Sequence, residues 1–300
     1  MIIVKLALTF LCTLVGVAYL TLLERKMLSY IQNRKGPNKV GLSGILQPFA
    51  DAVKLFLKDM IVPYSSNKVF FILFPVASLM LGLYLWGLIP SFYGFTIVPL
   101  GILLFLSISA VNVYITMGAG WASNSIYSFL GGIRASAQTI SYEISLVFVL
   151  LLPLMFMASI SLQKFLVGYP TMLLVFYSMA LWFVSGLAET NRAPFDFAEG
   201  ESELVSGFNI EYSGGLFALL FLGEYTMILF MGLLTSVVFL TPNSLVMLGF
   251  GALVVCLLFL VVRGVYPRLR YDLLMSMCWK SILPISISLV SLIHVVYLLW

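Results

Sequence analysis

Charged residues, histidine and cysteine are all scarce in this chain. Only 9% of its 300 residues are charged, whereas a soluble domain carries about a quarter. The single histidine, His294, excludes haem ligation by two histidines within the chain. The three cysteines form no CxxC pair, so neither a disulfide framework nor a thiolate metal or iron–sulfur site is suggested. We predict no resident metal and no nucleic-acid partner.

The catalytic motifs of soluble enzymes are missing as well. With one histidine, predicted to lie toward the membrane face away from most charges, no Ser/His/Asp or Cys/His triad can form. The pair Gly131–Gly132 before Arg134 is too short a signal for a phosphate-binding loop. No inverted repeat, low-complexity tract or linker is evident, so one integral membrane domain, 1–300, is expected. A stand-alone proton-coupled transporter, the alternative from another class, should show such a repeat and paired broken helices.

Apolar residues, in contrast, dominate the chain. Hydrophobic residues make up 62% of it, and the mean hydropathy is +1.10. The long apolar runs are too continuous for barrel strands, so we predict an all-α polytopic membrane protein with eight transmembrane helices of about 20 residues. The runs are 2–23, 69–90, 97–119, 137–160, 171–188, 216–240, 245–262 and 281–299. The first run is long enough to span and is expected to be retained.

The basic residues indicate how these helices are oriented. All sixteen Lys and Arg except Lys5 and Lys164 fall in the connections after the first, third, fifth and seventh runs. The positive-inside rule assigns that side to the cytoplasm or the mitochondrial matrix. All twelve acids lie toward the same side. Both termini are therefore expected on the opposite, nearly uncharged side.

The first long connection, 24–68, contains an amphipathic helical pattern. From Gln47 to Met60 the apolar residues recur at helical spacing, and Asp51, Lys54 and Lys58 share the other side. We expect an amphipathic helix at the membrane interface. It is either a peripheral helix anchored by its apolar face or one wall of a portal for an amphiphilic ligand.

Half of the acids gather in another connection, 189–215, in which only Arg192 is basic. The connection 24–68 holds eight basic and three acidic residues, so opposite charges predict that the two connections dock into one polar cap. Separate solvated loops are the alternative. The six acids are Glu189, Asp196, Glu199, Glu201, Glu203 and Glu211. The alternating three at 199–203 would share one face in an extended chain but not in a helix, and their titrations must couple.

Two further carboxylates lie within apolar runs. Glu143 is about seven residues inside the fourth run, roughly 10 Å deep, and Glu224 about eight inside the sixth, roughly 12 Å deep. Tyr142 and Tyr225 adjoin them, and Glu189 closes the fifth run. Carboxylates at membrane depth are rare and usually face a polar cavity or relay protons. A hydrated proton path is favoured, with an interhelical hydrogen bond from a permanently protonated Glu as the alternative.

Several segments, in the expected order, resemble one known family. The segment ETNRAPFDFAEGESELVSGFNIEY at 189–212 resembles the signature of the quinone-site membrane subunit of respiratory complex I. Similar blocks are ERKMLSYIQNRKGPNKVG at 24–41, QPFADAVKLF at 47–56, GGIRASAQTISYEI at 131–144 and YPRLRYDLLM at 266–275. The resemblance covers essentially the whole chain. Its length is most similar to that of the mitochondrially encoded type, which would lie in the mitochondrial inner membrane.

The resemblance implies a subunit of a proton-pumping NADH:ubiquinone reductase with no redox centre of its own. FMN and iron–sulfur clusters would lie only in partner subunits, and ubiquinone would be the substrate. Partners would include the hydrophilic quinone-site subunits, neighbouring membrane subunits and lipid. The homologous subunit of a membrane-bound hydrogenase is the nearest alternative, and it would lack a tunnel of ubiquinone length.

The same resemblance assigns roles to individual residues. The quinone tunnel would lie among the first helix, the amphipathic helix and the sixth helix. Tunnel residues would be Glu24, Arg25, Arg34, Phe49, Ala52, Phe56, Arg192, Phe221, Arg268 and Arg270. Proton-coupling residues, rather than direct reductants, would be Glu143, Glu189, Glu224, Asp196, Glu199, Glu201, Glu203, Glu211, Tyr142 and Asp51.

Overall fold

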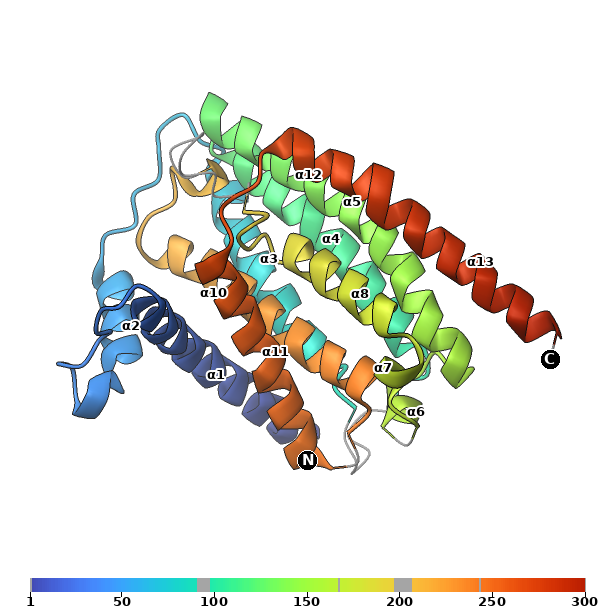
Figure 1. Ribbon diagram of the computed structural model, residues 1–300. Coiled ribbons are helices and arrows are strands. Elements are labelled where there is room, and N and C mark those ends of the chain that lie inside the picture. Colours follow the sequence, from blue (N-terminus) through green and yellow to red (C-terminus); the bar gives the residue numbers. More distant parts are fainter. Residues whose placement is uncertain (1, 91–97, 167, 197–206, 243, 300) are drawn as a thin grey trace.

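A computed structural model describes residues 2–90, 98–166, 168–196, 207–242 and 244–299, and within these ranges every regular element is helical (Figure 1). The long helices are α1 (Ile2–Ile31), α3 (Lys68–Trp86), α4 (Gly101–Ala122), α5 (Ile126–Met157), α8 (Phe176–Glu189), α10 (Gly214–Thr235), α11 (Leu245–Val265) and α13 (Leu283–Leu299). The shorter ones are η1 (Leu42–Gly44), α2 (Gln47–Leu57), α6 (Leu162–Phe165), α7 (Thr171–Leu174), η2 (Gly207–Asn209), η3 (Ser236–Leu240), α12 (Tyr271–Met277) and η4 (Cys278–Ile282).

Seven helical segments of the described chain are long and apolar enough to cross a membrane, rather than the eight expected. They are Val4–Ile31, Lys68–Trp86, Gly101–Ala122, Ile126–Met157, Gly214–Leu240, Leu245–Val265 and Tyr271–Val295. The remaining run, 171–188, is interrupted at Val175, whose φ of −136° and ψ of 62° separate α7 from α8. With 14 residues, α8 is about 21 Å long, which is shorter than the roughly 30 Å of the hydrocarbon core.

The connection expected between the third and fourth runs is largely helical. α4 ends at Ala122 and α5 begins at Ile126, so Arg134 lies within a helix of 32 residues. Glu143 is therefore 143 − 126 = 17 residues from the start of α5, about 26 Å, and not about seven residues inside a helix. Gly131 and Gly132 permit this extension, because Cβ atoms there would lie 2.9 Å from the backbone of Gly207 and 3.4 Å from that of Gly120.

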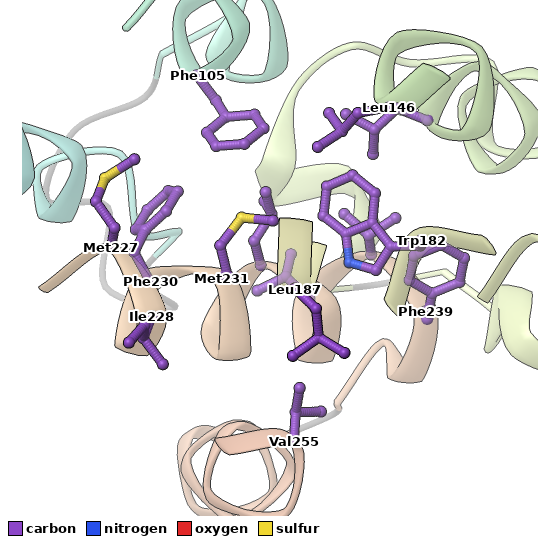
Figure 2. Close-up of a cluster of buried hydrophobic side chains, with 14 of the residues drawn as sticks. Phe105, Leu146, Trp182, Leu187, Met227, Ile228, Phe230, Met231, Phe239 and Val255 are labelled. Carbon is purple, nitrogen blue, oxygen red and sulfur yellow. The ribbon is translucent and has the colours of Figure 1, made fainter. Parts of the chain in front are cut away.

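The core forms around α10, which packs against α3, α11, α2 and α1. Figure 2 shows its side chains directed toward Phe105 of α4 and Trp182 of α8, with Val255 of α11 on the other side. The rings of Phe105 and Phe230 lie 5.7 Å apart between centroids. α10 and α3 approach closely, since a Cβ atom at Gly223 would lie 3.1 Å from the carbonyl carbon of Ser78.

The two oppositely charged connections lie at the same end of the bundle. α2 lies beside the end of α1 that is distant from the N-terminus, and both chain ends lie at the opposite end of the bundle (Figure 1). The backbone N–H of Ile61 donates to Ser213 Oγ at 3.1 Å, so the expected contact between the connections is present. An ion pair between Glu24 and Arg192 also joins them. In this pair the acid comes from the mainly basic connection and the arginine from the mainly acidic one.

Candidate functional site

A cavity of about 430 Å³, here called the outer cavity, lies between α1, α2 and α10. Its size falls within the range of pockets that bind small molecules. Apolar side chains from all three helices share the lining with the charged residues Glu24, Arg25, Asp51 and Arg263. The remaining lining residues are Val17, Ala18, Thr21, Leu28, Pro48, Ala52, Leu55, Phe56, Phe217, Ala218, Phe221, Leu222 and Tyr225. The cavity is therefore amphiphilic.

α2 forms one wall of this cavity because its sequence is amphipathic. Phe56 and Ala52, one turn apart, line the cavity together with Asp51. Asp51 pairs with Arg25 of α1 and accepts a hydrogen bond from Gln47 Nε2 at 3.1 Å. The pair with Arg25 ties the polar side of α2 to α1, while Leu57 remains 78% exposed on the outside.

A buried ion cluster stands at the end of the outer cavity, where α1, α10 and α11 meet the turn after α8. Glu24 is its centre: its Oε1 accepts from Arg192 NH1 at 3.3 Å and pairs with Arg263, and its Oε2 accepts from the Tyr225 hydroxyl at 2.6 Å. The Arg192 guanidinium also lies over the Tyr225 ring, 4.3 Å from its centroid. One carboxylate thus balances two arginines.

A second, smaller cavity of about 30 Å³, here called the inner cavity, lies on another side of α10. Glu189 and Glu224, predicted as separate coupling residues, both line it. The other lining residues are Ser78, Asn112, Ile115, Thr116, Thr190, Asn191, Phe208, Leu220, Gly223 and Met227. Among the described residues, no protein group donates a hydrogen bond to the buried Glu189 Oε2 or Asn191 Oδ1.

Electrostatics favour the neutral form of Glu189 at physiological pH. Burial, and next the nearby charge of Glu143, raise the pKa of Glu189 to about 8. Glu143 itself accepts a hydrogen bond from Ser109 Oγ at 3.2 Å, which joins α5 to α4. Glu143 does not line the inner cavity, so the structure brings Glu189 and Glu224 together and leaves Glu143 at its periphery.

Two short segments separate the cavities. Glu224 and Tyr225 are consecutive on α10, yet Glu224 lines the inner cavity and Tyr225 the outer one. At the C-terminal end of α8, Glu189 faces the inner cavity, and in the turn that follows, Arg192 contacts Glu24 beside the outer cavity. The wall between the cavities therefore presents protonatable side chains to both of them: Glu189 and Glu224 to the inner cavity, and Arg192 and Tyr225 on the outer side.

Several predicted tunnel residues lie away from the outer cavity. Arg34 is exposed in the turn after α1, and Phe49 packs edge-on against Tyr19, 6.3 Å between ring centroids. Arg268 pairs with the buried Asp196 at 3.2 Å, and Arg270 pairs with Asp272 at the surface at 3.1 Å. The predicted tunnel residues that do line the cavity are Glu24, Arg25, Ala52, Phe56 and Phe221.

The predicted coupling residues are likewise only partly gathered. Tyr142 is fully buried and donates to the carbonyl oxygen of Leu274 at 3.2 Å, outside both cavities. Glu211 is half-buried shortly before α10. Glu199, Glu201 and Glu203 lie outside the described residues. Within the described ranges, no three His, Cys, Asp or Glu side chains form a group that could hold a metal ion.

Sequence reasoning missed Arg263, Asn112 and the direct role of Tyr225. Arg263 is the first basic residue after the apolar run 245–262, and Asn112 is an amide within the run 97–119. Each is a polar group at a position where burial is costly, and that cost was the available signal. The sequence identifies Tyr225 only as the neighbour of Glu224.

Comparison with known proteins identifies the family of this chain. The family described as NADH dehydrogenase matches residues 4–294. NADH-ubiquinone oxidoreductase chain 1 of Aedes aegypti is 52% identical over 92% of this chain and 90% of its own length. The proteins of that name from Artemia franciscana and Lampetra fluviatilis are 54% and 49% identical, over 91% and 94% of this chain and 92% and 91% of their own lengths. The chain belongs to the NADH dehydrogenase family, the family of NADH-ubiquinone oxidoreductase chain 1.

Proposed function

We propose that this chain is the membrane subunit through which NADH:ubiquinone oxidoreductase admits ubiquinone from the lipid and begins to move protons. The single observation that carries the first part is the outer cavity. Its apolar lining suits a long isoprenoid tail, since burying apolar surface contributes about 25 cal/mol per Å². Its charged end, at Glu24 and Arg263, suits the polar head of the quinone as it passes.

The position of α2 supports a portal rather than a helix that is merely peripheral. One face of α2 carries exposed apolar residues such as Leu57 and Val53, as expected of a helix lying at a membrane interface. Phe56 and Ala52 of the same helix line the cavity. An amphiphilic ligand could therefore pass from the lipid interface into the protein along α2.

The inner cavity is proposed as the start of the proton path. Its volume of about 30 Å³ can hold at least one water molecule, which needs roughly 10–15 Å³ and two to four polar partners. Glu189 carries its proton at neutral pH because its pKa is about 8, and so it can donate to such a water. Glu224, which lines the same cavity, can receive the proton.

The ion cluster offers a connection between quinone and proton path. A quinone near Glu24 would perturb a carboxylate that is held by Arg192 and Tyr225. Those two residues are close neighbours in sequence of Glu189 and Glu224. This chain would lie in the mitochondrial inner membrane. Electron transfer itself would occur at FMN and iron–sulfur clusters of partner subunits. The hydrophilic quinone-site subunits would adjoin the end of the bundle that holds the ion cluster.

Phe56→Glu tests the portal. We expect the KM for a long-tailed quinone to rise about tenfold or more, because about 1.5–3 kcal/mol of apolar contact is lost. A short water-soluble quinone, which buries less tail, should be affected less. Leu57→Glu is the matched control, since it adds the same charge to the same helix but outside the cavity lining. Equal loss for short and long tails, or equal effects of both variants, would reject the portal.

A further inference from the structure

Gln138 is a fully buried amide that none of the proposed steps above uses. It lies on α5, on the face that meets the turn after α8. Its Nε2 donates two hydrogen bonds, to the carbonyl oxygens of Ala188 at 3.1 Å and Phe195 at 2.8 Å. One side chain therefore joins the two ends of the turn.

This turn, taken here as residues 188–196 so that it includes the last two residues of α8, carries functional groups for both cavities. It presents Glu189 to the inner cavity and Arg192 to Glu24 beside the outer one. Its internal bonds run from the backbone N–H of Arg192 to Leu187 O at 3.2 Å and from that of Phe195 to Arg192 O at 2.8 Å. The two hydrogen bonds from Gln138 tie both ends of the turn to a single neighbouring helix, α5.

The chemistry of this contact favours an amide. Both partners are carbonyl oxygens, so a side chain must supply two donors from one atom without bringing charge into a fully buried site. An ionised carboxylate has no donor, and an ammonium would be a buried cation. Asparagine has the same group on a side chain that is one methylene shorter.

We propose that Gln138 is a positioning residue of the coupling route, which fixes the 188–196 turn so that Glu189 and Arg192 serve the two cavities together. This inference rests on the function proposed above. Gln138 acts through the turn rather than on quinone or protons. Loosening the turn should alter how Glu189 titrates and should leave the fold of the bundle in place.

The direction of the expected change follows from the groups that face Glu189. They are Glu224 of α10 in the same cavity and Glu143 of α5, whose charge raises the pKa of Glu189. The lining from α3 and α4 is neutral, with Ser78, Asn112 and Thr116. Burial is the larger cause of the raised pKa. A looser turn that admits solvent lowers the pKa, and so moves the loss of turnover at alkaline pH to lower pH.

The test uses Gln138→Met in the whole assembled complex. Its rate of NADH oxidation by a soluble artificial acceptor should match the parent, because that reaction does not require the membrane part. Quinone reductase turnover should fall, with its alkaline limb displaced downward by about half a pH unit or more. Thr139→Val is the matched control, since Thr139 is adjacent and buried, and among the described residues its hydroxyl bonds only to Ala135 O and Ser136 O of its own helix.

Two further variants separate the possible failures. Glu189→Gln should lower turnover and remove the alkaline limb near pH 8 from the turnover that remains, and adding Gln138→Met to it should cause no further displacement, because residues that act as a unit are not additive. An unchanged Glu189→Gln profile would overturn the proposed proton path. An effect of Glu189→Gln with a Gln138→Met profile like that of Thr139→Val would overturn this inference alone. If Gln138→Met fails to assemble, Gln138→Asn, which keeps both donors on a side chain one methylene shorter, replaces it. Its pH profile is then the one compared with that of Thr139→Val.

Discussion

Replacing Glu24 with glutamine should destabilise the part of the bundle that holds the buried ion cluster. The amide keeps the size of the carboxylate but removes its charge. In the parent protein the Glu24 carboxylate balances both Arg192 and Arg263. In the variant these two arginines would face each other across a neutral group. The Tyr225 hydroxyl would also lose a charged acceptor at 2.6 Å, and hydrogen bonds to charged groups are the stronger kind.

The magnitude follows from burial. Removing one partner of a fully buried ion pair costs about 3–5 kcal/mol. The side chains of Glu24 and Arg192 are 5% and 11% exposed, but that of Arg263 is 27% exposed, so solvent screens part of the cost. We expect about 2–3 kcal/mol. At about 1.4 kcal/mol per factor of ten, the variant should inactivate at least about tenfold faster on heating.

The assay is the half-life of quinone reductase activity in the purified complex at one elevated temperature, with each variant normalised to its own initial rate. Adding Arg263→Gln to Glu24→Gln should restore much of the half-life, because the cluster returns to its original net charge. Asp272→Asn is the control: it removes a pair whose side chains are 77% and 72% exposed, for which less than about 1 kcal/mol is expected. A half-life of the single variant within about twofold of the parent, or a double variant less stable than the single one, would refute this reasoning.

Two more predictions concern proton transfer and orientation. Glu143→Gln and Glu224→Gln should each lower quinone turnover and proton pumping together in sealed vesicles, with normal assembly, because a neutral amide costs no more to bury than a protonated acid; near-normal pumping in both would support structural hydrogen bonds instead. In oriented membranes, a thiol label at Lys39→Cys should react from the matrix side and one at the C-terminus from the other side, and matrix access to the C-terminus would contradict the predicted orientation.

The apolar runs predicted most of the helices, because length and continuity suffice to identify a spanning segment. They failed where packing decides the outcome. The segment 120–136, rich in glycine and serine, reads as a connection, but close backbone contacts at Gly131 and Gly132 favour helix there, which overrides local propensity. The interruption at Val175 has no such signal in the sequence.

For the candidate site, the sequence identified the functional groups more successfully than their positions relative to one another. Glu189 and Glu224 were expected on chemical grounds, since buried carboxylates are costly. That they share one cavity depends on the close approach of α3 and α10 at Gly223 and Gly82, which a single sequence does not reveal. The link from Gln138 to Ala188 and Phe195 spans 50 and 57 positions and was equally out of reach.

The adjacency of Glu224 and Tyr225 has a consequence for how this chain can change over evolution. Consecutive helical residues point about 100° apart, and here that angle separates two cavities. Inserting or deleting one residue between Gly214 and Glu224 would turn the carboxylate out of one cavity and place the tyrosine elsewhere. The ten-residue spacing from the start of α10 should therefore tolerate substitution but be fixed in length.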